Sequence, residues 1–143
     1  MEYKKTNQGM IVKIVKGEKI VEELKKFCEL EGIKNGWFSG IGAPDWAEIA
    51  HYSVVDKKYS SFVLEEPLEM ISLLGNVFLG PENELVIHAH ISVGRPDGEM
   101  RGGHLVEARI GGACEILFTP IEASLKKKFD EETGLKILNL SGQ

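Results

Sequence analysis

"LVIHAHISVGRPDGEMRGGHLVEARIGGACEI", residues 85–116, holds three of the four histidines of this chain and all three of its arginines. Its first nine residues alternate between two kinds of side chain, and in a β-strand alternate side chains share a face. One face would be wholly apolar and would belong to the core: Leu85, Ile87, Ala89, Ile91 and Val93. His88 and His90 would then stand side by side on the opposite face, with Val86 and Ser92.

A turn follows this predicted strand. Pro96 presets its own backbone angle, Asp97 can accept a hydrogen bond from a nearby backbone N–H, and Gly98 tolerates positive φ. We expect residues 94–103 to form a glycine-rich loop, and "HLVEARI" (104–110) and "ACEILFTPIE" (113–122) to form further strands. If the loop closes a hairpin, His104 returns beside the histidine pair.

The three histidines have the ligand types of a zinc-like site. An H-x-H pair on a strand can chelate one ion, and His104 would give the third imidazole of a site with an open fourth position. The alternative is that histidines on a solvated sheet face only bond to backbone groups or water, and the spacing leaves both readings open. His51, the fourth histidine, is expected to be an ordinary surface or core residue.

The segment Gly94-Arg95-Pro96 resembles the core of an AT-hook, which inserts Arg-Gly-Arg-Pro into the minor groove of DNA. Val93 stands where the first arginine of a hook belongs, and Asp97 and Glu99 would repel phosphate. We therefore reject the hook. A contact with an anion or with DNA would instead use Arg95, Arg101 and Arg109, with the lysines at 126–128.

Composition sets limits on the class of protein. The 143 residues suit a single domain over 1–143, and the net charge of −5 argues against broad, sequence-independent DNA binding. Cys28 and Cys114 are far apart and are expected to be buried thiols. We find no secretion signal and no membrane span, so we expect a cytoplasmic protein. Glutamine is rare and lysine and glutamate are abundant, as in heat-adapted chains.

The rest of the chain predicts one long helix and several strands. Residues 18–33 carry a helical stripe of Ile20, Leu24, Phe27 and Glu31, and Gly32 would end it. Residues 35–54 read as two strands separated at Pro44, residues 68–80 as a strand, and residues 126–134 as polar and partly helical. The prediction is an α+β fold with a bent, mostly antiparallel, barrel-like sheet and a helix packed on it.

The opening stretch resembles the signature of the plants and prokaryotes conserved (PPC) domain, above all in its run H-x-H…D-G-x-x-x-G-G-H-L. The stretches "WFSGIGAPDWAEIAHY" (37–52) and "PLEMISLLGNV" (67–77) extend the resemblance, which runs from about Gly9 to Leu140. It implies a compact α+β homotrimer. Many prokaryotic members keep the histidine pair, which implies a metal site at His88, His90 and His104.

The resemblance also implies a link to DNA, because plant members join this domain to AT-hooks and act on AT-rich DNA in the nucleus. Single-domain prokaryotic members have been described as DNA-binding mainly by that analogy. No reaction is established for the family, so the resemblance implies none. In a trimer the histidines would lie near a subunit boundary, where a neighbouring chain could supply a fourth ligand.

Three functions remain open from the sequence. The first is a homotrimeric module that binds a zinc-like metal ion, a small ligand or both at the three histidines. The second is a DNA-associated regulatory protein that uses Arg95, Arg101 and Arg109. The third is a metal-dependent enzyme, with Glu48 or Glu107 as its base.

Overall fold

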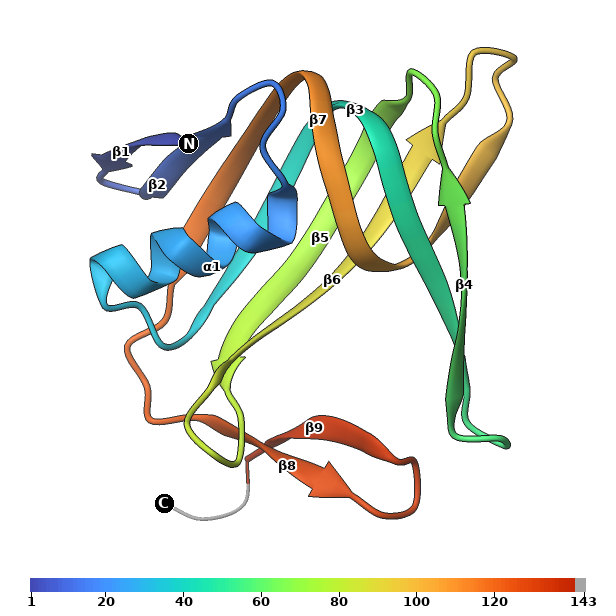
Figure 1. Ribbon diagram of the computed structural model, residues 1–143. Helices are drawn as coiled ribbons and strands as arrows, with labels where there is room; N and C mark the ends of the chain where they lie inside the picture. The colour runs from blue at the N-terminus through green and yellow to red at the C-terminus, as the bar shows by residue number, and fades with distance from the viewer. Residues whose placement is uncertain (141–143) are drawn as a thin grey trace.

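The computed structural model describes residues 1–140 and shows a mostly β protein (Figure 1). Within that range there is one helix, α1 (Ile20–Glu31). The expected α+β class therefore overestimates the helical content of the fold. The strands are β1 (Glu2–Thr6), β2 (Gly9–Ile14), β3 (Gly36–Ser53), β4 (Lys58–Leu64), β5 (Glu69–Leu79), β6 (Leu85–Gly94), β7 (Met100–Pro120), β8 (Lys126–Asp130) and β9 (Leu135–Asn139).

The central sheet closes on itself. β3 pairs with β5, β5 with β6, β6 with β7, and β7 pairs in turn with β3, each pair antiparallel. Apart from these, β2 extends the sheet beside β7, and β8 meets β5 in a short parallel contact. The prediction of a bent, mostly antiparallel, barrel-like sheet is therefore confirmed.

Two of the central strands are longer than the sequence patterns predicted. β3 runs through Pro44 without a break, because register shifts on both sides of Pro44 bend the strand instead of ending it. The two strands expected over 104–122 are likewise a single bent strand, β7. The strands approach closely at Gly42, where a Cβ would lie 2.5 Å from the carbonyl oxygen of Ala113.

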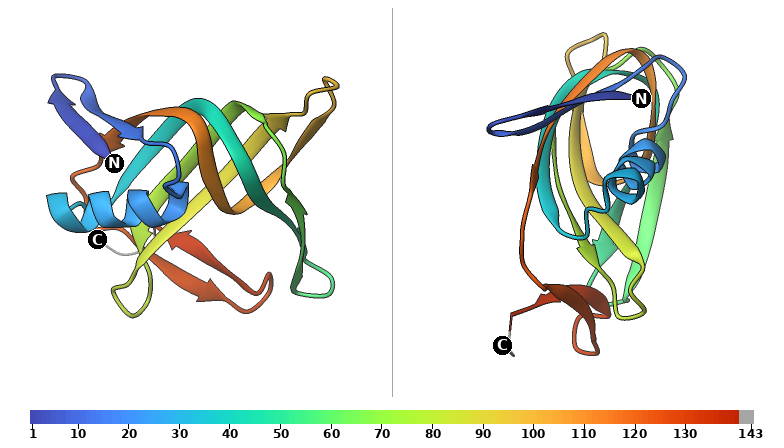
Figure 2. Two further views of the ribbon diagram at one scale, coloured as in Figure 1. Left: turned by 45° about the horizontal axis from the view of Figure 1, so that its top comes forward. Right: turned by 90° about the vertical axis from the view of Figure 1, so that its left-hand side faces the viewer.

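The C-terminal segment differs from the expectation for residues 126–134. The polar run forms strand β8 and a turn, with no helix, because β8 pairs antiparallel with β9. The pairing begins with Lys126 opposite Asn139 and ends with Asp130 opposite Leu135. Residues 68–80 contain strand β5, as predicted. The β8–β9 hairpin lies at the edge of the molecule opposite the β1–β2 hairpin (Figures 1 and 2).

Helix α1 covers one side of the closed sheet (Figure 2) and buries Ile20, Leu24 and Phe27 completely. It ends at Gly32, whose φ of 66° is the left-handed conformation that the sequence predicted there. Glu31, expected on the apolar stripe, instead accepts a hydrogen bond from the Tyr3 hydroxyl at 2.6 Å. The polar end of the stripe therefore ties the helix to β1.

The interior of the sheet and the inner face of α1 form one hydrophobic core. Cys28 and Cys114 lie in it as free thiols, as predicted, and burial raises the pKa of each to about 12. In the described part of the chain, no helix has the length and apolar character needed to cross a bilayer.

Candidate metal centre

The β6–β7 hairpin brings the histidines together. His90 on β6 lies directly opposite His104 on β7, and His88 precedes His90 by two residues on the same face. The turn forms where the sequence placed it, with a hydrogen bond from the N–H of Gly98 to the carbonyl of Arg95 at 2.9 Å. Gly98 has a φ of 85°. The loop is shorter than expected, because β7 already begins at Met100.

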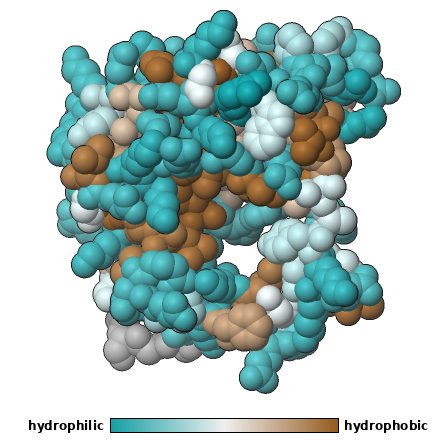
Figure 3. Space-filling view, viewed as in Figure 1, coloured by the Kyte–Doolittle hydropathy of each residue, from teal (hydrophilic) through white to brown (hydrophobic). Residues whose placement is uncertain are grey.

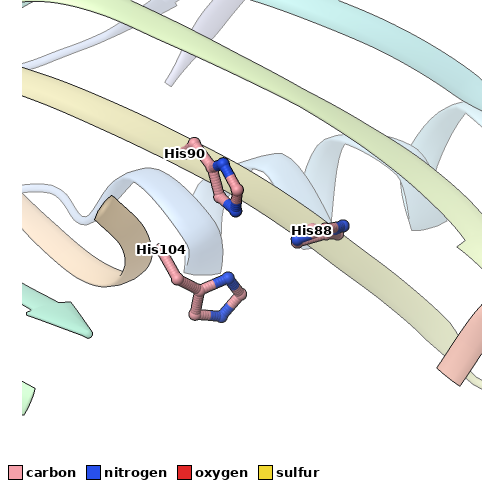
Figure 4. Close-up of side chains that lie close together, drawn as sticks. All are labelled: His88, His90 and His104. Atoms are coloured by element: carbon pink, nitrogen blue, oxygen red, sulfur yellow. The ribbon is translucent and has the colours of Figure 1, made fainter. Parts of the chain in front are cut away.

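The three rings converge on one point (Figure 4). Ring centroids lie 5.1 Å apart for His88 and His90, 5.3 Å for His88 and His104, and 5.9 Å for His90 and His104. One nitrogen of each ring lies within 4.8 Å of the others. Nitrogens bound to one tetrahedral ion at zinc distances lie about 3.4 Å apart, so small side-chain rotations would suffice to close the set. We call these residues the histidine cluster.

The histidine cluster lies in a hollow of about 880 Å³ between the central sheet and the β8–β9 hairpin. The space-filling view shows an opening between this hairpin and the rest of the molecule (Figure 3). Tyr59 of β4 packs its ring 5.1 Å from that of His104. Trp37, Asn76 and Lys127 also line the hollow. The site is therefore walled, and the lining residues come from seven strands of the chain, β3 to β9.

The surroundings favour neutral imidazoles at His88 and His104. Partial burial, the nearby ammonium of Lys127 and the other two histidines together lower the pKa of His88 to about 4. Burial, His90 and Lys127 also lower the pKa of His104. A metal ion binds the neutral ring, so these two side chains are in the form that coordination requires.

The two glutamates considered as bases lie outside the histidine cluster. Glu107 accepts hydrogen bonds from the backbone N–H groups of Val21 and Glu22, at 2.8 and 3.2 Å, and so caps the start of α1. Burial raises its pKa. Glu48 accepts a hydrogen bond from the Ser61 hydroxyl at 2.8 Å, and neither glutamate lines the hollow. The structure therefore places neither candidate base beside the histidine cluster.

His51, predicted to be no ligand, is exposed and lines the hollow outside the histidine cluster. The sequence did not indicate that Lys127 and Asn76 lie beside the histidine cluster. Asn76 lies opposite His88 on β5, and only the strand register could have indicated this. Lys127 is the middle of three consecutive lysines in a segment that was expected to be partly helical, so nothing in the sequence distinguished it from its neighbours.

Every arginine is paired with an acidic side chain. Arg95 bonds to Glu66 at 2.7 Å, and Arg101 bonds to Glu99 at 2.9 Å. Arg109 bonds to Asp45 at 2.7 Å. The three arginines predicted to contact an anion therefore carry their own counter-charges, and none of them lines the hollow.

Comparison with solved structures finds the same fold over nearly the whole chain. A metal-containing protein from Archaeoglobus fulgidus is 34% identical, with a TM-score of 0.86 and 96% of each chain covered. A plant- and prokaryote-conserved protein from Pyrococcus horikoshii is 30% identical, with a TM-score of 0.84 and coverage of 93% of this chain and 92% of the other.

A presumed DNA-binding protein from Bacteroides thetaiotaomicron is also 30% identical, with a TM-score of 0.93 and coverage of 99% and 98%. No curated protein matches the chain. The family model of the Plants and Prokaryotes Conserved (PCC) domain matches residues 1–122. The chain therefore belongs to the plants and prokaryotes conserved domain family, as its histidine-rich hairpin indicated.

Proposed function

We propose that this protein is a homotrimeric metal-binding module that holds one zinc-like divalent ion at His88, His90 and His104. The observation that carries the proposal is the convergence of three imidazole nitrogens within 4.8 Å inside a walled hollow. The relative from Archaeoglobus fulgidus, named a metal-containing protein, supports it. When bound by three protein ligands, such an ion supplies an electrophilic centre with an open position for a small ligand.

An apolar row on the outer face of the sheet supports the trimer. The row crosses five neighbouring strands, and each of its members lies directly opposite the next. In order, the members are Ile11, Leu117, Ser39, Leu74 and His90. The three apolar members are 41–59% exposed, which is unusual for adjacent large side chains on one sheet face. We call Ile11, Leu74 and Leu117 the outer apolar row. A subunit that covers this row would lie beside the histidine cluster, where it could contribute a further ligand.

The alternative DNA-binding role draws support from two similar structures named as presumed DNA-binding proteins, from Bacteroides thetaiotaomicron and Ralstonia eutropha. Ion pairs neutralise the arginines that would contact phosphate, and the net charge of −5 opposes approach to DNA. We therefore rank DNA binding below metal binding.

Zinc loading tests the proposal. Wild-type protein treated with zinc and dialysed should retain one ion per chain, measured by atomic absorption. His88→Ala combined with His90→Ala should lose it, because one remaining imidazole cannot hold the ion through dialysis. Circular dichroism should show an unchanged fold, since both side chains point away from the core. His51→Ala is the matched control and should keep its zinc. A wild-type protein that holds no zinc would refute the proposal.

A further inference from the structure

Lys127 has a largely buried side chain whose ammonium group finds no counter-charge among residues 1–140. It is 6% exposed, whereas its neighbours Lys126 and Lys128 are exposed. Lys126 donates a hydrogen bond to Asn83 at 2.6 Å, but residues 1–140 offer the Lys127 ammonium neither an ion pair nor a hydrogen bond. Burying a cation without a partner is costly, so such a group is a candidate for binding an anion from outside.

The ammonium of Lys127 lies in the same hollow as the histidine cluster, close enough to act on both His88 and His104. A divalent ion on three neutral imidazoles would add two further positive charges, and no carboxylate side chain of the described residues lines the hollow. The positive charge in the hollow therefore favours the binding of an anionic ligand, and this preference increases when the ion is bound.

Asn76 adds a second unsatisfied group. It lies directly opposite His88 in the β5–β6 ladder, so both side chains project from the same face. Its Oδ1 atom is buried and receives no hydrogen bond from residues 1–140. A buried amide oxygen of this kind accepts a hydrogen bond from a hydroxyl or amine.

The remaining walls are largely apolar and include Trp37, Val54, Ile87 and Leu138. They favour an organic molecule over a fully hydrated inorganic anion, and a volume of about 880 Å³ is in the range of small-molecule sites. The single free ammonium matches one carboxylate better than a more highly charged phosphate.

We propose that the hollow binds a small organic carboxylate that also carries a hydroxyl or amine, with the carboxylate on Lys127 and the donor group on Asn76. This inference rests on the proposed metal site, because the ligand would occupy the space between these residues and the ion. Lys127 and Asn76 are then the residues that determine which ligands bind.

The test uses the zinc-saturated full chain and isothermal titration calorimetry at constant ionic strength, with L-lactate as the probe. Lactate should bind, and propionate, which lacks the hydroxyl, should bind more weakly. The uncharged lactamide should bind at least roughly tenfold more weakly, because it loses the charged hydrogen bond to Lys127. Comparison of the three probes requires no variant, so it does not depend on the folding of a mutant.

Lys127→Met should weaken lactate binding at least roughly tenfold while keeping one zinc per chain, and Lys126→Met is the matched control that should bind as the wild type does. Asn76→Ala should remove the preference for lactate over propionate. Circular dichroism and zinc content are measured for each variant.

The outcomes separate the two proposals. Loss of zinc from the wild type would refute the metal site itself. If the zinc-loaded wild type does not bind lactate, or if the Lys127→Met variant binds lactate as tightly as the wild type, the ligand assignment is overturned and the metal site is unaffected. Inorganic phosphate binding more tightly than lactate would overturn the organic class of the ligand.

Discussion

His88 is the member of the histidine cluster that its surroundings alter most. It follows Ile87 on a strand that alternates between core and outer face, so its position was readable from the sequence. Its pKa of about 4 was not, because one of the groups that lower it, the Lys127 ammonium, lies on β8, about forty residues further along the chain.

The depressed pKa of His88 predicts how the metal-free protein responds to acid. The unfolded chain, with an ordinary histidine pKa of about 6.5, binds more protons than the folded chain between pH 6.5 and 4. The free energy of unfolding should therefore fall as the pH falls through that window. Urea denaturation with a chelator present, at pH 7, 5.5 and 4.5, measures this. His88→Gln should reduce the slope, and an unchanged slope would show that His88 is not responsible.

At the scale of single elements, helix α1 depends on a residue far away in the sequence. Lys19, at the N-cap position, makes no side-chain capping hydrogen bond. The Glu107 carboxylate on β7 instead accepts hydrogen bonds from the backbone N–H groups of Val21 and Glu22. A negative group at this end also suits the helix dipole. The residue first considered as a catalytic base therefore has a structural role.

Glu107→Ala should lower the free energy of unfolding by about 1–2 kcal/mol, the usual cost of losing an N-cap. Zinc stoichiometry should not change, because Glu107 does not line the hollow. Urea denaturation and metal analysis give both values. Glu115→Ala, at an exposed position on the same strand, is the control and should change stability by less than about 0.5 kcal/mol. Loss of zinc from a folded Glu107→Ala protein would contradict this assignment.

At the scale of the whole molecule, the outer apolar row predicts assembly. Light scattering at micromolar concentration should give the mass of a trimer. Leu117→Lys should shift the mass toward the monomer, since a charge buried in an interface is costly without a partner. Val55→Lys is the control, because Val55 is 92% exposed and lies outside the row. A wild-type monomer would remove the support for a trimer.

The charge of the whole molecule predicts weak DNA binding at most. Duplex DNA at physiological salt should bind no more tightly than micromolar, and any binding should weaken steeply as salt rises. Fluorescence anisotropy with a labelled duplex measures this. Sub-micromolar binding that disappears when Arg95 and Arg101 are both changed to alanine would reverse the ranking of the two functions.

The sequence alone predicted the local features of the site. Alternation over residues 85–93 placed His88 and His90 on one face, Pro96-Asp97-Gly98 predicted the turn, and the hairpin between them brought His104 alongside. Each of these depends on neighbours within about fifteen residues, where strand periodicity and turn chemistry act directly.

Only the tertiary structure decided the rest. Pro44 lies inside a strand because bulges against β7 absorb the bend, and Glu107 caps a helix that begins 87 residues earlier. Lys127 faces the histidines because β8 pairs with β9 and docks beside β5. These outcomes come from pairings between distant segments, and the local pattern of residues does not contain the register that sets them.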